Sequence, residues 1–295
     1  MLRDVARELR SADLTIGNLE GTFGRGGISK CGGAPSPNCF AFQAPPENAR
    51  ALEAVGFDVM NIANNHALDY GEEGQRQTIT ALDRVHIRHT GRPGAVTLLP
   101  VRGVRVAIIG FAPYRWATSL TDIPAARTLV TQAAKVADLV IVIMHAGAEG
   151  ADRSHTPNGP ETQYGEDRGY ARGFAHATID GGADLVLGSG PHVVRGMEVH
   201  RRRLIAHSLG NFAGHHNFTT GGTLSHSGIV RVKLGPTGQL VSGRWISVRI
   251  DPPGIPRLDG FHAAAQFVRR LSAQDFGADA VRMDERGAFQ AAQRG

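Results

Sequence analysis

The sequence predicts a layered α/β fold whose strands end in polar residues. Short apolar segments with the character of strands alternate along the chain with amphipathic segments of helical length, which is the pattern of α/β proteins. A hydrophobic content of 41% and a charged content of 20% are those of an ordinary globular protein. No stretch approaches the roughly 18 uninterrupted apolar residues that a membrane-spanning helix needs. A chain of 295 residues can therefore bury a large core.

The alternation is clearest in the first two thirds of the chain. Short runs rich in Val, Ile and Leu predict strands, and the longer segments between them, which mix apolar and polar residues, predict helices. The predicted strands are Leu14–Gly17, Phe57–Ile62, Val104–Phe111, Leu139–Met144 and Leu185–Leu187. The predicted helices are Pro46–Val55, Gly71–Val85, Ala125–Val136 and Gly169–Gly181.

The pattern changes after residue 190, where antiparallel strands are expected. Met197–His200 and Arg203–Ser208 flank a turn of arginines and predict a hairpin, and Ile229–Leu234 and Val241–Ile250 continue the strand-like alternation. The segment from Phe261 to the C-terminus predicts a helix followed by a loosely held polar tail. We therefore expect one domain over residues 1–255, and a C-terminal helix with a polar tail over residues 256–295.

The positive charge of the chain does not indicate a nucleic-acid partner. A net charge of +5 could suggest one, but only Lys30, Lys135 and Lys233 are lysines and the remaining basic residues are arginines spread along the whole chain. The one cluster of arginines, residues 201–203, fits the turn of the predicted hairpin. We expect no nucleic acid to bind.

Two cysteines lie in a Gly- and Pro-rich segment that reads KCGGAPSPNCF. A bridge between Cys31 and Cys39 would close a short loop and contribute roughly 2.5 kcal/mol through the entropy of the unfolded chain. The alternative is two free thiols; the spacing does not fit a zinc knuckle, because no second Cys/His pair is nearby. We favour the disulfide, since no other cysteine competes, and it implies an oxidising compartment.

Four predicted strands end directly in residues that can bind metals. In open α/β sheets, sites form beyond the carboxyl ends of the strands, so we expect these residues to converge on one face. An isolated strand-end histidine is more often a structural hydrogen-bonding group, but four such groups at four successive strand ends are hard to assign to chance. The motifs are LTIGNLEG with Asn18 and Glu20, FDVMNIANNHALDYG with Asn64, Asn65, His66 and Asp69, LVIVIMHAGAEG with His145 and Glu149, and ADLVLGSGPHV with His192.

The chemistry of these side chains selects the class of metal. Oxygen and nitrogen donors in this mixture suit Zn²⁺, Mn²⁺ or Fe rather than an all-oxygen calcium site. We assign structural roles to the histidines that lie in helical, strand or linking segments, and a cleft-lining role stays open for those in loops or near strand ends. The first group is His86, His89, His176, His200 and His262, and the second is His155, His207, His215, His216 and His226.

At these motifs the chain resembles the CapA-type family of poly-γ-glutamate (capsule) biosynthesis proteins, a branch of the calcineurin-like metallophosphoesterases. The resemblance extends from about residue 13 to residue 215. It implies a two-sheet sandwich flanked by helices, with four layers in the order α/β/β/α. The matching text is NLEG at Asn18–Gly21, NNHALDYG at Asn64–Gly71, His145 to Glu149, GADLVLGSGPHV at Gly182–Val193 and SLGNF at Ser208–Phe212.

The resemblance also implies roles for individual residues. Glu20 would take the position of a carboxylate that bridges two metals, and Asn65 would bind one metal. His145 would bind the second metal and His192 the first. Two cations roughly 3.5–4 Å apart need such a carboxylate to offset their repulsion. His66 would be the catalytic acid, which protonates the leaving oxygen, or a group on the phosphate side of the site. The remaining polar residues expected on the substrate side of the cleft are Asn18, Asn64, Glu149 and Arg195.

The chain departs from the family pattern at two places. Family members normally have a first strand that ends in Gly-Asp, whose Asp binds a metal, whereas this chain opens on MLRDVARELRSADL, which predicts the helix that follows that strand. Asp4 in this helix is a poor substitute. The histidine that typically precedes the one matched by His192 is replaced by Ser189 and Gly190. The ligand set is thus sufficient for one metal and marginal for two.

Two functions are compatible with these features. The first is a metal-dependent hydrolase, acting on a phosphoester or on an amide of a γ-glutamyl polymer. The second is a non-catalytic module that holds an anionic polymer in a membrane-associated synthesis or export complex. Either substrate would suit arginines near the cleft, such as Arg153, Arg172 or Arg195. We expect an exported or membrane-associated location, with no signal or anchor segment in this chain.

Overall fold

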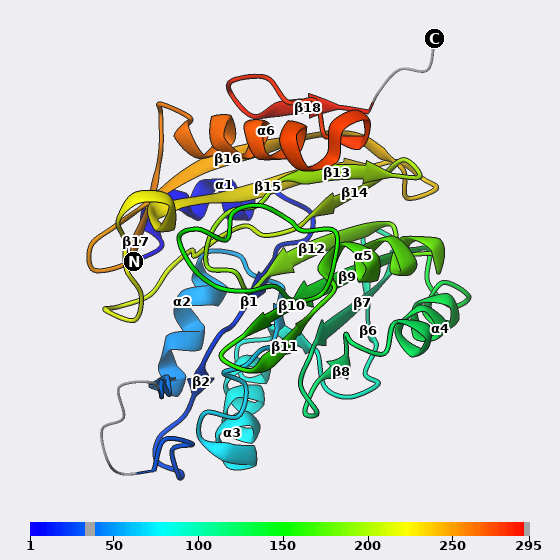
Figure 1. The fold of residues 1–295 in the computed structure, drawn as a ribbon. Coiled ribbons are helices and arrows are strands. Elements are labelled where there is room, and N and C mark those ends of the chain that lie inside the picture. Colours follow the sequence, from blue (N-terminus) through cyan, green and yellow to red (C-terminus); the bar gives the residue numbers. More distant parts are fainter. Residues whose placement is uncertain (33–38, 292–295) are drawn as a thin grey trace.

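The structure, a computed structural model, describes residues 1–32 and 39–291. Two sheets face each other in the centre of the molecule and helices cover their outer faces (Figure 1). The apolar residues between the sheets include Val59 of the smaller sheet and Ile108 and Ile141 of the larger one, and all three are buried. The predicted two-sheet sandwich flanked by helices is confirmed.

The smaller sheet is parallel and consists of β1 (Ile16–Asn18), β4 (Val59–Asn61) and β5 (Arg88–Thr90), in that order. Its outer face is covered by α2 (Ala49–Ala54) and α3 (Gly71–Asp83). Met60 of β4 and Leu82 of α3 are buried in the same apolar cluster, so side chains on alternate sides of β4 pack against both layers.

The larger sheet has the strand order β13-β14-β12-β9-β7-β6, with β8 paired to β7. The inner strands β7, β9, β12 and β14 are parallel, and β6 and β13 are antiparallel edge strands. Helices α4 and α5 cover the outer face, where Val130 and Phe174 pack on Val142. The bounds are β6 Thr97–Val101, β7 Val104–Ala112, β8 Thr118–Ser119, β9 Leu139–His145, β12 Leu185–Ser189, β13 Met197–His200, β14 Arg203–Ala206, α4 Ile123–Ala133 and α5 Ala171–Asp180.

A third, antiparallel sheet forms from the C-terminal part of the chain. It contains β15 (His226–Leu234), β16 (Leu240–Asp251), β17 (Ile255–Leu258) and β18 (Ala288–Gln290), and α6 (Ala263–Phe276) packs on it. The residues after α6 were expected to be a loosely held tail, and this expectation is wrong up to residue 291. Strand β18 pairs with β16 and buries Phe289 in the core, which the polar sequence around it did not indicate.

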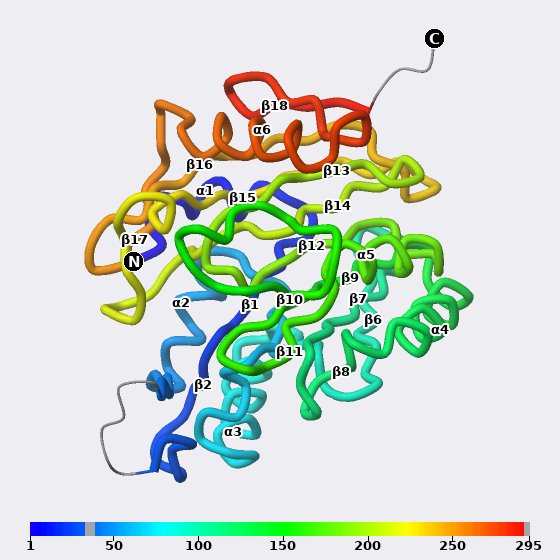
Figure 2. The backbone as a smooth tube through the Cα atoms, viewed as in Figure 1, coloured from blue at the N-terminus to red at the C-terminus, as the bar shows by residue number. Residues whose placement is uncertain are grey.

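Short elements complete the chain. The N-terminal helix α1 was predicted, and the backbone trace in Figure 2 shows it beside β15 and β16, which come far later in the sequence. The Arg231 side chain of β15 fixes this position through an ion pair of 2.8 Å with Glu8. These elements are η1 Arg3–Val5, α1 Ala6–Arg10, β2 Thr22–Phe23, β3 Gln43–Ala44, η2 Pro46–Asn48, β10 Glu161–Gln163, β11 Glu166–Gly169, η3 Gly222–Ser225 and η4 Gly277–Asp279.

No helix in the described ranges combines the length and the apolar character that a bilayer crossing requires. The predicted disulfide is confirmed, since Cys31 and Cys39 are bonded to each other.

A buried carboxylate, Glu198 of β13, ties the larger sheet to α5 and to the segment after β14. Its Oε1 accepts hydrogen bonds from His207 at 2.9 Å and His176 at 3.0 Å, and its side chain is fully buried. Burial acts to raise the pKa of Glu198, but the two histidines outweigh it and lower that pKa to about 2.

The lowered pKa of Glu198 predicts a loss of stability in acid. A carboxyl group whose pKa falls on folding stabilises the protein above its ordinary pKa of 4.5, and this contribution is lost as the pH falls toward 2. We expect the native protein to exceed Glu198→Gln in unfolding free energy by up to about 3 kcal/mol near neutral pH, and the difference to shrink below about pH 4. Urea unfolding of both proteins across this range measures it. A difference in unfolding free energy that does not change with pH would contradict a lowered pKa of Glu198.

Candidate metal centre

The strand ends that carry the polar motifs meet at one edge of the sandwich. Strand β4 pairs in parallel with β1 in the smaller sheet, and β12 pairs in parallel with β9 in the larger sheet. His145 is the last residue of β9 and lies opposite Ser189 at the end of β12. The convergence expected from the sequence therefore has its basis in parallel pairing, which places carboxyl ends side by side.

Glu20 lies at the centre of the site. Its Oε1 is 3.4 Å from Nε2 of His192 and 3.8 Å from Nε2 of His145. Oε2 of Glu149 approaches Nε2 of His192 to 4.0 Å from the other side. Four of the residues singled out in the sequence are thus in one cluster, with both imidazoles turned toward the same carboxylate.

Each of the two histidines is oriented by a bond to its other ring nitrogen. Nδ1 of His145 is 3.2 Å from Oγ of Ser189, and Nδ1 of His192 is 2.7 Å from Oδ1 of Asn211. Such partners fix the tautomer and the direction of a histidine that binds a metal. Neither Ser189 nor Asn211 was expected to contribute from the sequence, although Asn211 lies in the SLGNF motif.

The backbone explains why position 190, in the turn after β12, is a glycine and not a histidine. Gly190 has φ +120° in the region that favours glycine, and a Cβ there would stand 2.9 Å from the carbonyl oxygen of Ala146. A side chain at this position would collide with the end of β9. The turn continues to His192, which itself has φ +59°.

Three asparagine side chains, of residues 18, 61 and 64, support Glu20 through its Oε2 oxygen, and we call them the asparagine brace. Nδ2 of Asn18 donates to Oε2 of Glu20 at 3.1 Å, while Oδ1 of Asn18 accepts from Asn61 and Asn64 at 3.0 and 3.2 Å. Asn64 also donates to the carbonyl of Leu19. Asn18 and Asn64 were expected to contact substrate, but these bonds make them supports of Glu20. Asn61 was not expected to contribute, because it lies within an apolar strand segment.

His66 is held in a pair with Asp69. Nδ1 of His66 is 2.8 Å from Oδ2 of Asp69, and the backbone N–H of His66 donates to Oδ1 of Asn64 at 3.0 Å. Asp69 is fully buried. The aspartate fixes the imidazole ring and leaves Nε2 without a hydrogen-bond partner among the described residues.

The donor atoms of the cluster fit a divalent cation. Oε1 of Glu20, Oδ1 of Asn65 and Nε2 of His145 are buried and have no hydrogen-bond partner in the described chain, which is costly unless another group binds them. Ligands about 2.1 Å from one tetrahedral ion lie about 3.4 Å apart, close to the spacing of Glu20 from the two histidines. Within the described residues, no group of three His, Cys, Asp or Glu side chains forms a complete site alone. Oδ1 of Asn65, in the turn that follows β4, is a further buried atom of the kind that binds metals.

The charges of Glu20 and His145 suit a cation, and His192 would have to release its proton to bind one. Burial lowers the pKa of His145 to about 4, so this imidazole is neutral, as a metal ligand must be. Burial acts to raise the pKa of Glu20, but the neighbouring His145 and His192 hold it well below its ordinary value. Burial opposes the charge on His192, yet Glu20 and the bond to Asn211 raise its pKa to about 9. Glu20 is therefore ionised.

Arg195 does not face the cleft. Its side chain is fully buried and binds Glu161 with both terminal nitrogens, at 2.8 and 2.7 Å. It also donates to the carbonyl oxygens of Arg153 and Ala148. The expected substrate contact is thus replaced by a structural one that holds the loop carrying Glu149. Glu149 itself forms an ion pair of 2.7 Å with Arg168.

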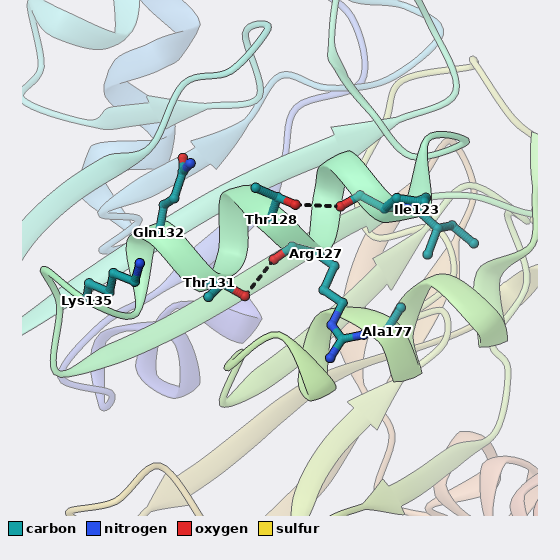
Figure 3. Close-up of a pocket in the computed structure, with 8 residues that line it drawn as sticks. Ile123, Arg127, Thr128, Thr131, Gln132, Lys135 and Ala177 are labelled. Carbon is teal, nitrogen blue, oxygen red and sulfur yellow. Dashed lines mark hydrogen bonds between the residues drawn. The ribbon is translucent and has the colours of Figure 1, made fainter.

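A surface pocket of about 560 Å³ lies away from this cluster, on the outer side of α4 and next to α5 (Figure 3). Arg127, Thr131 and Lys135 are among its lining residues, and none of the candidate metal-binding side chains takes part in it. The pocket is thus separated from the candidate metal-binding residues by the helix layer of α4 and α5.

Comparison with known proteins gives a consistent family. Residues 1–216 match the family described as bacterial capsule synthesis protein PGA_cap. The capsule biosynthesis protein CapA of Bacillus anthracis is 32% identical over 189 residues, covering 57% of this chain and 43% of that protein. The PGA biosynthesis protein CapA of Bacillus subtilis (strain 168) is 29% identical over 187 residues, covering 58% of this chain and 46% of that protein. The match thus spans less than half the length of these relatives.

Among solved structures, a 5′-nucleotidase precursor from Thermus thermophilus aligns with 76% of this chain and 45% of that chain. The TM-score is 0.42 and the sequence identity is 14%.

Proposed function

This chain belongs to the PGA_cap family of bacterial capsule synthesis proteins, as its motifs predicted, and we propose that its cleft is a metal-dependent hydrolytic centre. The observation that carries the proposal is the set of three buried donor atoms without partners in the described chain, on Glu20, Asn65 and His145, beside the imidazole of His192. A site that had lost its metal function would have little reason to keep uncompensated polar atoms in its interior.

Four residues would hold the cation: Glu20, Asn65, His145 and His192. When bound, a divalent ion such as Mn²⁺, Zn²⁺ or Fe²⁺ supplies Lewis-acid polarisation of a phosphoryl or carbonyl oxygen. The asparagine brace keeps Glu20 in place for this task, and Ser189 and Asn211 keep the two imidazoles turned inward. Positioning by such supporting contacts is what gives a site its affinity.

His66 would deliver the proton to the leaving oxygen. Its Nδ1 is fixed on Asp69, so Nε2 is the atom that can hold and transfer a proton. The residue lies directly after Asn65 in the chain, which places the acid next to a metal ligand. His66 thereby acts on the substrate rather than on the ion.

The substrate class that we propose is an anionic one, either a phosphoester or a γ-glutamyl polymer handled outside the cytoplasm. The family assignment supports a role in capsule synthesis, and the Cys31–Cys39 disulfide supports an oxidising compartment. Membership of a membrane-associated synthesis complex belongs to the same proposal.

The test is elemental analysis of the purified chain, combined with hydrolysis of a generic aryl phosphodiester. We expect about one equivalent of transition metal and slow turnover, because two close cations would need more ligands than Glu20, Asn65 and the two histidines supply. Two equivalents with rapid turnover would show that the ligand set is richer than proposed. Absence of both metal and turnover would favour the polymer-binding module instead.

A further inference from the structure

The buried carboxylate that orients His66 receives contacts from a second segment of the chain. Lys30 places Nζ 2.6 Å from Oδ1 of Asp69, and the backbone N–H of Phe42 donates to Oδ2 at 2.6 Å. His66 shares Oδ2 at 2.8 Å. Asp69 is therefore surrounded by three groups, and two of them come from residues on either side of the Cys31–Cys39 bridge.

The same two residues contact the neighbours of Asp69. The backbone N–H of Lys30 donates to the carbonyl of Asp69 at 2.8 Å, and Nζ of Lys30 donates to the carbonyl of Asn65 at 3.3 Å. The ring of Phe42 lies 4.5 Å from the ring of His66, measured between centroids. Lys30 and Phe42 thus both contact the segment from Asn65 to Asp69, through hydrogen bonds and a ring contact.

The disulfide keeps Lys30 and Phe42 close enough together to make these contacts at the same time. Cys31 follows Lys30 directly and Cys39 shortly precedes Phe42, and the bridge keeps the Cα atoms of the cysteines 5.6 Å apart. Without the bridge, the two contacts would be joined only through the chain between the cysteines, which are 8 positions apart in sequence. Ordering both contacts at once would then cost more conformational entropy.

We propose that Lys30 and Phe42, held together by the Cys31–Cys39 bridge, are positioning residues for His66. Lys30 places a positive charge beside the buried carboxylate of Asp69. Phe42 packs its ring on the imidazole of His66 and donates its backbone N–H to Asp69. This inference rests on the proposed role of His66, because a positioned imidazole matters only if the imidazole acts.

The experiment follows the reactivity of His66 with diethyl pyrocarbonate, read site by site by mass spectrometry on the full chain. The variants are Cys31→Ser/Cys39→Ser, Lys30→Met and the charge-conserving Lys30→Arg. Loss of a charge-assisted hydrogen bond favours local opening of the segment around His66 by about tenfold. We therefore expect His66 to react about tenfold faster in Lys30→Met, and also in the cysteine variant, where the same contact is no longer held in place by the bridge. Lys30→Arg should react at nearly the native rate.

Two other histidines serve as internal references. His155 has an exposed side chain, 63% accessible, and its rate should be the same in all forms. His207 is buried, so its reaction reports global unfolding. Faster labelling of His66 with His207 still protected supports the proposal. Unchanged labelling of His66 in both variants, or parallel labelling of His66 and His207, overturns it.

Hydrolysis of the aryl phosphodiester separates this inference from the proposed function. If both hold, kcat falls in Lys30→Met while KM and metal content stay at native values. A native chain that does not hydrolyse the ester, but whose His66 responds to the variants, refutes the hydrolytic function and leaves the positioning role standing. Hydrolysis with an unresponsive His66 refutes the positioning role alone.

Discussion

Replacing His145 by alanine is expected to abolish the proposed metal binding, and with it the proposed hydrolytic activity. His145 is fully buried and its Nε2 has no hydrogen-bond partner in the described chain, so this nitrogen is available to bind an ion and alanine removes it. Loss even of a supporting contact lowers metal affinity by about 10- to 100-fold, and loss of a direct ligand should exceed that. Titration with Zn²⁺ or Mn²⁺, followed by elemental analysis after dialysis, measures the effect.

His66→Ala is the matched variant, because His66 lies in the same cleft but is not expected to bind the ion. We expect its metal content to equal that of the native chain and its kcat to fall by about 10²-fold or more, which is the usual contribution of a general acid. His155→Ala, which changes an exposed histidine outside the cleft, should alter neither quantity. Loss of metal in His66→Ala would mean that the two roles are assigned to the wrong residues.

The second large effect concerns the buried pair of Arg195 and Glu161. Arg195→Met should destabilise the protein by about 3–5 kcal/mol, because it leaves the carboxylate of Glu161 buried without its partner. Glu161 also accepts from the N–H of Ala148, so the loop that carries Glu149 should loosen as well. Unfolding in urea gives the free energy.

The control for this prediction is an exposed pair of the same kind, an arginine with a carboxylate. Arg105 bonds Asp138 at 2.8 Å, but both side chains are largely exposed, so Arg105→Met should lower the unfolding free energy far less than Arg195→Met. The double variant Arg195→Met/Glu161→Gln should regain part of the lost stability, since it removes the uncompensated charge. Equal effects of Arg195→Met and Arg105→Met would show that the buried pair is not a main support of the loop.

Much of the α/β arrangement could be predicted because strands buried on both faces are continuous apolar runs. Strands β7, β9 and β12 pack between helices and the smaller sheet, so their sequences carry a strong signal. The edge strand β6 is apolar but contains Pro100, which argues against a strand, and β5 reads Arg-His-Thr without an apolar residue, so neither could be recognised. Strand β18 could not be recognised either, because it is short and lies in a polar stretch of the sequence.

The residues available to the candidate site could be identified from the sequence alone. Glu20, Asn65, His66, His145 and His192 each follow or end a strand, and parallel strands end at a common edge. The contacts of each side chain depend on the tertiary structure. In the folded chain Arg195 is buried against Glu161, and Asn18 and Asn64 support Glu20. Ser189 and Lys30 contact residues of other strands and loops. Those contacts depend on the distance between segments far apart in the chain, and no local pattern of residues specifies such distances.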